Sequence, residues 1–223
     1  MVNGENASFI SGISDELAET LVRGGADCIT GGNHTMHQRR AYTMLDERQE
    51  VIRPANYGGK APGRGYCILD SNGYRVLVIN VMGNVHIDPV LDSPFDTVDR
   101  ILGENEGRYD IAVLDIHAEA TGEKLALAHY FDGRINVIFG THTHVQTADE
   151  QILPKGSGYI TDVGMCGESG GILGMDADRV VERMRTRVPH PFKVAVGEVV
   201  ANGVIFTVNT STGKVTSVER IKL

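Results

Sequence analysis

The sequence predicts an α/β protein with a mixed sheet or two packed sheets, and three observations favour this fold class. Nearly continuous apolar runs of strand length at 111–116 and 136–140 alternate with helical segments, which is typical of strands buried on both faces of a sheet. Segment 66–81 contains Asn72-Gly73, the preferred turn of a two-residue hairpin. The last part of the chain, from residue 192, has the pattern of a meander of antiparallel strands.

The N-terminal third predicts further alternation of helix and strand. Segment 14–25 begins with the capping residue Ser14, places apolar residues on one face and ends at a glycine pair, so we expect a helix there. A strand at 26–30 and a helix at 39–47 should follow. Near the C-terminus, Asn209 to Gly213 should form the turn of the last hairpin.

Composition limits the class of protein. The 223 residues, 41% hydrophobic, suit one core, so we expect a single domain over 1–223. A formal net charge of -8 without a Lys/Arg run argues against stable binding of nucleic acid. Three widely spaced cysteines favour reduced thiols. The sequence shows neither a membrane-length apolar stretch nor a signal peptide, which makes the cytoplasm the expected location.

Polar residues with metal-binding groups follow four of the apolar segments. Because parallel strands bring their carboxyl ends to one edge of a sheet, these groups should meet there and form a site. Carboxylate, amide and imidazole together suit iron, manganese or zinc better than magnesium alone. The residues are Glu5, Asn6, Asn33, His34, His117, His142 and His144.

Each group also has an ordinary structural interpretation. The pair His142 and His144, in "GTHTHVQT", could be a polar turn after a strand, and Asn33 could stand in a left-handed turn. The other histidines, His37, His86, His129 and His190, are interpreted as surface or core residues. Taken together, the four groups favour two ions, with Glu5 between them.

Several motifs resemble the YmdB-like family of bacterial metallophosphoesterases across essentially the whole chain. They are "NGENA" (3–7), "GNHT" (32–35), "RPAN" (53–56), "DIHAEATGEKLAL" (115–127), "DGR" (132–134), "GTHTHVQTAD" (140–149), "ILPKGSGYITDVGM" (152–165) and "GILGMD" (171–176). The resemblance implies a calcineurin-like α/β/β/α sandwich of four layers. It also implies a phosphodiesterase with two metal ions that hydrolyses 2′,3′-cyclic nucleotides or related phosphodiesters.

The same resemblance implies a role for each site residue. Glu5 is similar to the bridging carboxylate, while Asn33, His117 and His142 would hold one ion, and Asn6 and His144 the other. His34 is similar to the general acid that protonates the leaving oxygen after attack by metal-bound hydroxide. We expect divalent or trivalent ions, iron or manganese with zinc as an alternative. A small phosphodiester or cyclic nucleotide is the expected substrate, and a homo-oligomer the expected assembly.

The chain departs from the family at three places. Members begin earlier, with a strand and a Gly-Asp-x-x-Gly turn whose aspartate completes the first metal site, so we expect an N-terminally truncated fold. A misplaced gene start, a fragment, and a genuine short form with one weakened metal site all remain open. Met36-His37 replaces Trp-Asp, and Asn84 stands where an arginine is expected, which affects substrate preference more than metal binding.

Two other functions compete with this interpretation. An amidohydrolase also uses an H-x-H pair, but on the first strand of an eight-stranded barrel, whereas this pair stands at 142–144. A truncated, catalytically weak or inactive form could instead act as a binding or regulatory protein. Retained hydrolysis of a cyclic nucleotide would exclude that as the sole function.

Overall fold

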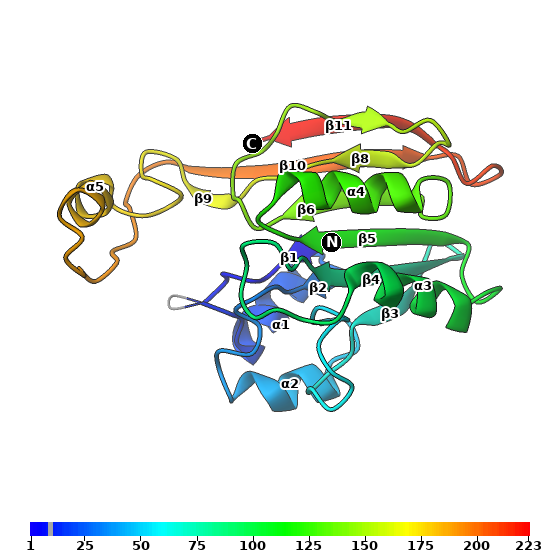
Figure 1. Ribbon diagram of the computed structural model, residues 1–223, viewed down its shortest axis with the longest axis horizontal. Coiled ribbons are helices and arrows are strands. Elements are labelled where there is room, and N and C mark those ends of the chain that lie inside the picture. The colour runs from blue at the N-terminus through cyan, green and yellow to red at the C-terminus, as the bar shows by residue number, and fades with distance from the viewer. Residues whose placement is uncertain (9–10) are drawn as a thin grey trace.

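The computed structural model describes residues 1–8 and 11–223 and contains helices and strands in alternation (Figure 1). The elements are β1 (Val2–Asn3), α1 (Asp15–Arg23), β2 (Ile29–Thr30), α2 (Ala41–Glu47), β3 (Tyr66–Ser71), β4 (Tyr74–Met82), α3 (Pro94–Glu104), β5 (Ile111–His117), α4 (Thr121–Phe131), β6 (Val137–Thr141), β7 (Gln151–Ile152), β8 (Gly158–Ile160), β9 (Cys166–Glu168), α5 (Ala177–Thr186), β10 (Val199–Val208) and β11 (Val215–Lys222).

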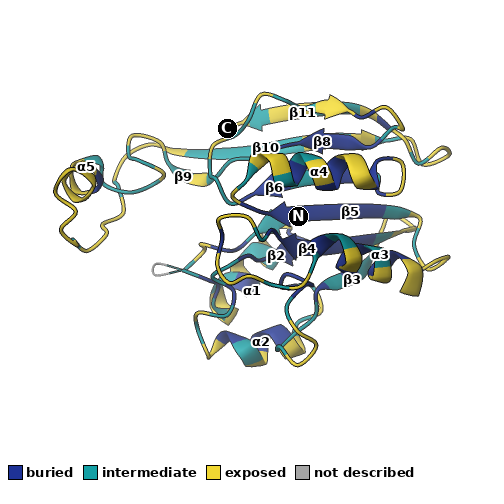
Figure 2. Ribbon diagram, viewed as in Figure 1, coloured by how far each residue is buried: buried dark blue, intermediate teal, exposed yellow. Residues whose placement is uncertain are grey.

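The central sheet has six strands in the order β3-β4-β5-β6-β8-β7. Strands β4, β5, β6 and β8 are parallel, and the outer strands β3 and β7 pair antiparallel. The predicted hairpin is confirmed: Asn72 and Gly73 have φ of 54° and 83°, as a turn with two left-handed residues requires. The apolar runs at 111–116 and 136–140 form β5 and β6, and Figure 2 shows β5 buried along nearly its whole length.

Helices α3 and α4 cover one face of this sheet. Ser93 caps α3 by accepting from the backbone N–H of Asp96, and Pro94 occupies the first turn. Apolar side chains of both helices pack against β4, β5 and β6, with Ile101 and Phe131 among the fully buried ones. This layer fixes the inner strands whose carboxyl ends carry His117 and the residues after Thr141.

The opposite face packs against the C-terminal strands. Val113 and Val137 of the central sheet lie in one cluster with Val215, Phe206 and Val218 of β10 and β11. Strands β9, β10 and β11 form an antiparallel sheet. The predicted antiparallel pairing is confirmed for β10 and β11, whose hairpin turns at Asn209 to Gly213, whereas β9 was not predicted.

One part of the C-terminal prediction was wrong. Residues 192–198 precede β10 and belong instead to an arm, residues 169–198, that leaves β9, forms α5 and returns (Figure 1). Helix α5 was not predicted, although Asp176 caps it by accepting from the backbone N–H of Arg179. In Figure 1 the helix stands apart from both sheets.

A small parallel sheet of β1 and β2 packs with α1 and α2, which lie at the bottom of the view in Figure 1, away from the C-terminal strands. Ser14 caps α1 as predicted, accepting from the backbone N–H of Leu17. The strand predicted at 26–30 is confined to Ile29–Thr30, because its partner β1 is two residues long. Among the described residues, no helix combines the length and apolar character needed to cross a membrane.

Candidate metal and active site

The carboxyl ends of β1, β2, β5 and β6 meet because Asp115 joins the two sheets. This fully buried carboxylate of β5 accepts from Asn3 Nδ2 (3.1 Å) and from the Thr30 hydroxyl of the small sheet, and from Thr141 Oγ1 (2.8 Å) of β6. Burial raises the pKa of Asp115 to about 6, against the lowering effect of its hydrogen bonds. All seven residues that the sequence singled out lie on or after the four strands tied together here.

The environment of His117 determines which ring nitrogen faces the site. Its Nδ1 lies 3.0 Å from Thr141 Oγ1, and that hydroxyl donates its hydrogen to Asp115. The hydroxyl therefore accepts from Nδ1–H, which leaves the lone pair on Nε2. Burial lowers the pKa of His117 well below its ordinary value, and the neighbouring His142 and Lys124 lower it further, so the ring is neutral.

Three other lone-pair atoms converge on Nε2 of His117. Asn33 Oδ1 lies at 3.0 Å, His142 Nδ1 at 3.2 Å and Glu5 Oε1 at 3.6 Å. Because Nε2 carries no hydrogen in this tautomer, these atoms repel one another unless a cation lies among them. The donor set therefore fits a metal ion.

Glu5 supports the same conclusion. The side chain is 3% exposed, Oε1 accepts from the backbone N–H of His34 (2.7 Å), and Oε2 has no hydrogen-bond partner within the described residues. Burial raises the pKa of Glu5 to about 8, with Asp115 adding to the rise and the His34 hydrogen bond opposing it. A buried carboxylate oxygen without a partner is costly, and a bound cation would remove that cost.

His142 is oriented in the same way as His117. Its Nε2 lies 3.0 Å from Glu119 Oε2, so the ring donates to the carboxylate and turns Nδ1 toward His117. Metal-binding histidines commonly have such a partner on the other nitrogen. Across residues 1–8 and 11–223, no group of three or more His, Cys, Asp or Glu side chains is arranged to hold an ion without the amides.

A buried ion pair holds the loop that carries the two histidines. His142 and His144 have φ of 97° and 68°, a conformation that costs energy for residues other than glycine. Asp162 accepts from the backbone N–H (3.0 Å) and hydroxyl (2.7 Å) of Thr143 between them. Lys124 of α4 donates to the same Asp162 oxygen at 3.0 Å, with both side chains almost fully buried.

The remaining predicted residues form a second group beside the first. Asn6 Nδ2 lies 3.2 Å from His144 Nε2, and Asn6 Oδ1 lies 3.0 Å from His34 Nδ1, which is 3.1 Å from Glu5 Oε1. The amide oxygen of Asn6 thus contacts His34 rather than His144. An ion held by Asn6 and His144 would require this amide to rotate.

The position of His34 bears on its predicted role as an acid. Its side chain is 32% exposed, with Nδ1 directed at Glu5 and Asn6. Burial lowers its pKa, and the nearby rings of His37, His142 and His144 lower it further, so His34 is less protonated at neutral pH than a free imidazole. His37 lies beside it, with ring centroids 4.7 Å apart, and contacts Ser11 Oγ at 3.2 Å.

Gly32 leaves the space that the His117 ring fills. A Cβ built on Gly32 would lie 2.2 Å from His117 Nε2, well inside van der Waals contact. The glycine of the "GNHT" motif therefore has a steric reason to be there.

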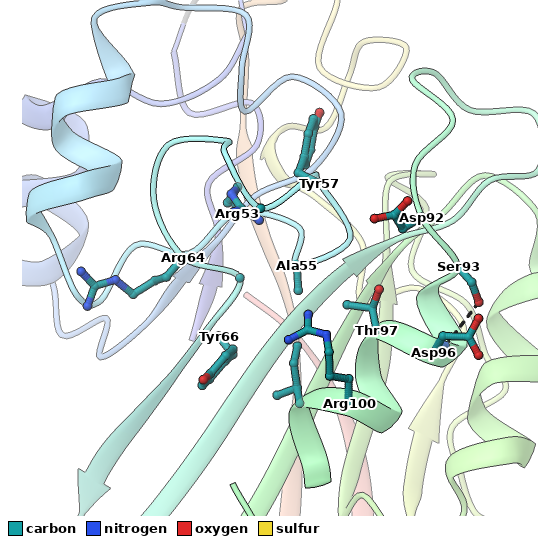
Figure 3. Close-up of a pocket in the computed structure, with 13 residues that line it drawn as sticks. Arg53, Ala55, Tyr57, Arg64, Tyr66, Asp92, Ser93, Asp96, Thr97 and Arg100 are labelled. Carbon is teal, nitrogen blue, oxygen red and sulfur yellow. Dashed lines mark hydrogen bonds between the residues drawn. The ribbon is translucent and has the colours of Figure 1, made fainter. Parts of the chain in front are cut away.

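A cavity of about 740 Å³ lies between segment 53–66 and segment 92–101 (Figure 3). Its lining contains none of the seven predicted site residues. The buried Arg53 on its wall donates to the carbonyl oxygens of Pro54, Ala61 and Pro62, which accounts for the arginine of "RPAN" as a structural residue. Asn84, the departure noted above, bonds Leu91 through both its amide atoms and closes the loop before α3.

Sequence reasoning missed the residues that orient the ligands: Asp115, Glu119, Lys124, Thr141 and Asp162. Their contacts join residues that are far apart in the sequence. Thr143 and Asp162 are 19 residues apart, and Lys124 and Asp162 are 38 residues apart. The available signal was their presence inside the long motifs at 115–127, 140–149 and 152–165.

The fold and the site define an α/β protein with a cluster of amide, carboxylate and imidazole groups at the carboxyl edge of its strands. Residues 1–221 match the model of the family described as YmdB-like protein, and the chain belongs to this family.

Proteins of known sequence or structure are similar to this chain over most of its length. The chain is 43% identical over 221 residues to the 2′,3′-cyclic-nucleotide 2′-phosphodiesterase of Bacillus subtilis, covering 99% of this chain and 83% of that protein. A crystal structure of a hypothetical protein from Thermus thermophilus has a TM-score of 0.90 at 38% identity, covering 100% and 86% of the two chains. That of a novel phosphatase from Mycoplasma pneumoniae has a TM-score of 0.87 at 33% identity, covering 96% and 77%.

Proposed function

We propose that this chain is a metal-dependent phosphoric diester hydrolase that acts on 2′,3′-cyclic nucleotides or related small phosphodiesters. The observation that carries the proposal is the convergence of lone-pair atoms of Glu5, Asn33 and His142 on Nε2 of His117. The activity for which the Bacillus subtilis relative is named supports the choice of substrate class.

We propose that the two groups of donors hold two ions, the second after rotation of the Asn6 amide. Asn33, His117 and His142 would hold one ion, Asn6 and His144 the other, with Glu5 shared between them. The mixture of oxygen and imidazole nitrogen donors suits iron or manganese, with zinc as an alternative. Bound there, the ions would supply positive charge for the phosphate oxygens and lower the pKa of water.

The residues of the chain would bind, orient and move a proton. His34 lies at the exposed rim of the cluster, with Nδ1 held by Glu5 and Asn6, so the opposite side of its ring is directed away from the donors. Burial lowers its pKa, and the negative charge of a bound phosphodiester would raise it again. We propose that His34 donates a proton to the leaving oxygen when the substrate is bound.

The packing of the helices and sheets indicates the architecture of the proposed enzyme. We propose one metallophosphoesterase domain over 1–223 with four layers: α3 and α4, the central sheet, the C-terminal strands together with β1 and β2, and α1 with α2. The proposal is supported by the packing of α3 and α4 on the central sheet, by the cluster that joins Cys28, Val137 and Val215, by the packing of α1 and α2 on β1 and β2, and by the TM-score of 0.90. We further propose that the protein is a homo-oligomer.

The test measures metal and activity on one sample. Elemental analysis of the purified chain should give about two ions per chain, and the same sample should hydrolyse 2′,3′-cyclic AMP. His142→Ala should lose both most of its metal and its turnover, whereas His129→Ala, at an exposed position of α4, should keep both.

Circular dichroism would establish that both variants fold. Near wild-type turnover by a folded His142→Ala would refute the assigned site. A wild-type chain with metal but no turnover on cyclic nucleotides or on bis(p-nitrophenyl) phosphate would refute the hydrolase and leave a binding role.

A further inference from the structure

The segment that follows His34 carries positive charge in an acidic chain. Residues 28–45 contain Arg39 and Arg40 but no Asp or Glu, whereas the whole chain has 29 Asp/Glu and a formal net charge of -8. Both arginines are exposed. Within the described residues neither forms an ion pair, and Arg40 donates through Nε to Gln38 Oε1 at 3.1 Å. Their charge is therefore available to an anionic ligand.

This segment lies directly beside the proposed general acid. The rings of His34 and His37 have their centroids 4.7 Å apart, and the backbone N–H of His37 donates to the His34 carbonyl oxygen at 2.9 Å. Arg39 and Arg40 come next, so their Cα atoms lie at most about 7.6 and about 11.4 Å from that of His37. A long arginine side chain at such a position can contact a part of the substrate that lies beyond the reacting phosphate.

Hydrogen bonds to Ser11 hold the segment in place. Ser11 Oγ lies 3.2 Å from His37 Nδ1, and Gln38 Nε2 donates to the Ser11 carbonyl oxygen at 2.6 Å. The Ser11 hydroxyl can donate to Nδ1, which leaves the hydrogen of the neutral ring on Nε2. The exposed His37 ring then offers an N–H donor that suits a phosphate oxygen.

We propose that His37, Arg39 and Arg40 form a subsite for a second phosphate group, so that the preferred substrates are short oligonucleotides that end in a 2′,3′-cyclic phosphate. This inference rests on the proposed function. The cyclic phosphate binds at the metal cluster, and the neighbouring phosphodiester binds at the arginines. Guanidinium groups bind phosphate through charge-assisted hydrogen bonds, commonly two at a time. Because the rest of the chain is acidic, the subsite binds one or two phosphates and not a long nucleic acid.

Kinetics with two substrates that differ by one nucleotide test the subsite. The wild type should have a kcat/KM about 10-fold or more higher for adenylyl-(3′→5′)-adenosine 2′,3′-cyclic phosphate than for 2′,3′-cyclic AMP, because hydrogen bonds to charged groups contribute on this scale. Arg39→Gln combined with Arg40→Gln should lower this ratio about 10-fold, mainly through the KM of the dinucleotide. His37→Ala should lower the ratio as well, and so should added salt. The control Arg23→Gln, on α1 with a side chain that is 78% exposed, should keep the wild-type ratio.

Binding of the two products separates this inference from the proposed function. Titration calorimetry with 3′-AMP and with adenylyl-(3′→5′)-adenosine 3′-phosphate, on Mn²⁺-loaded protein that circular dichroism shows to be folded, measures the same preference without turnover. Equal kcat/KM for the two substrates in the wild type overturns the inference, and equal affinity for the two products does so in a chain without turnover. A preference that the double arginine variant retains also overturns it. A chain that prefers the dinucleotide product but hydrolyses neither substrate would refute the proposed function alone.

Discussion

The hydroxyl of Thr141 lies 3.0 Å from Nδ1 of His117 and donates to Asp115, so it can only accept from that ring nitrogen. One hydroxyl in β6 thereby decides that His117 presents a lone pair, and not an N–H, to the cluster of donors. Glu119 does the same for His142 from the loop between β5 and α4. The site is thus prepared for a cation by residues that never touch the cation.

Thr141→Val should weaken metal binding without unfolding the protein. The valine keeps the shape of threonine but cannot accept from His117, and loss of such a partner typically lowers metal affinity about 10–100-fold. Titration calorimetry with Mn²⁺ measures the affinity, and Thr141→Ser should restore most of it. Thr216→Val, on exposed β11, should bind like the wild type. Equal affinity in Thr141→Val would show that the hydroxyl does not select the tautomer.

Lys124→Met should be strongly destabilising. The change leaves the Asp162 carboxylate buried without its cation, and breaking a buried pair in this way costs about 3–5 kcal/mol. Urea unfolding measures the loss, and Lys60→Met at an exposed position should stay within about 0.5 kcal/mol of the wild type. Lys124→Met combined with Asp162→Asn should recover part of the lost stability. A small effect of the single change would mean that water replaces the lysine.

Tyr159 should make the stability depend on alkaline pH. Burial raises the pKa of Tyr159 to about 12, above the ordinary value of about 10 that the unfolded chain retains. The neutral phenol is favoured in the folded state, so its contribution is complete below pH 10 and is lost as the pH rises toward 12. The extra slope approaches about 1.4 kcal/mol per pH unit.

Urea unfolding of the wild type and of Tyr159→Phe at several pH values in that window isolates this slope. The phenylalanine variant should be less stable at neutral pH, because Tyr159 Oη and Thr161 Oγ1 share a hydrogen bond of 2.9 Å. Its stability should fall less steeply above pH 10. Parallel curves for the two proteins would contradict the raised pKa.

The three thiols should differ in reactivity. Cys166 is exposed, whereas Cys28 and Cys67 are buried with their sulfur atoms 3.7 Å apart. The hydrogen bond with Cys67, together with burial, raises the pKa of the Cys28 thiol. Ellman's reagent should therefore titrate one thiol per native chain quickly and the other two after denaturation. Cys166→Ser should abolish the fast phase. Fast reaction of all three thiols in the native state would place the pair in a segment that opens readily.

The location of the site could be predicted because strand ends are visible in the sequence. The apolar runs before His117 and before His142 mark β5 and β6, and parallel strands bring their ends to one edge. The side chains that orient these histidines could not be predicted in the same way. Lys124 and Asp162 meet through the packing of α4 on the sheet, which no local pattern contains.

The arm shows that strand-like composition alone does not predict a strand. Residues 192–198 have strand-like composition but lie in an arm with an exposed tip, because the ladder with β9 begins only at Val199. The start of helix α5 could have been predicted from its capping residue Asp176. The amphipathic pattern of the helix, however, does not indicate which of its faces packs against the rest of the protein.

Gly32 sets a limit on how the family's chains can diverge. A single methyl group at position 32 would occupy the place of the His117 ring, so the ring fits only because residue 32 has no Cβ atom. Mutational drift can alter what surrounds the histidine, while position 32 is restricted to a single amino acid for as long as the ring stays where it is.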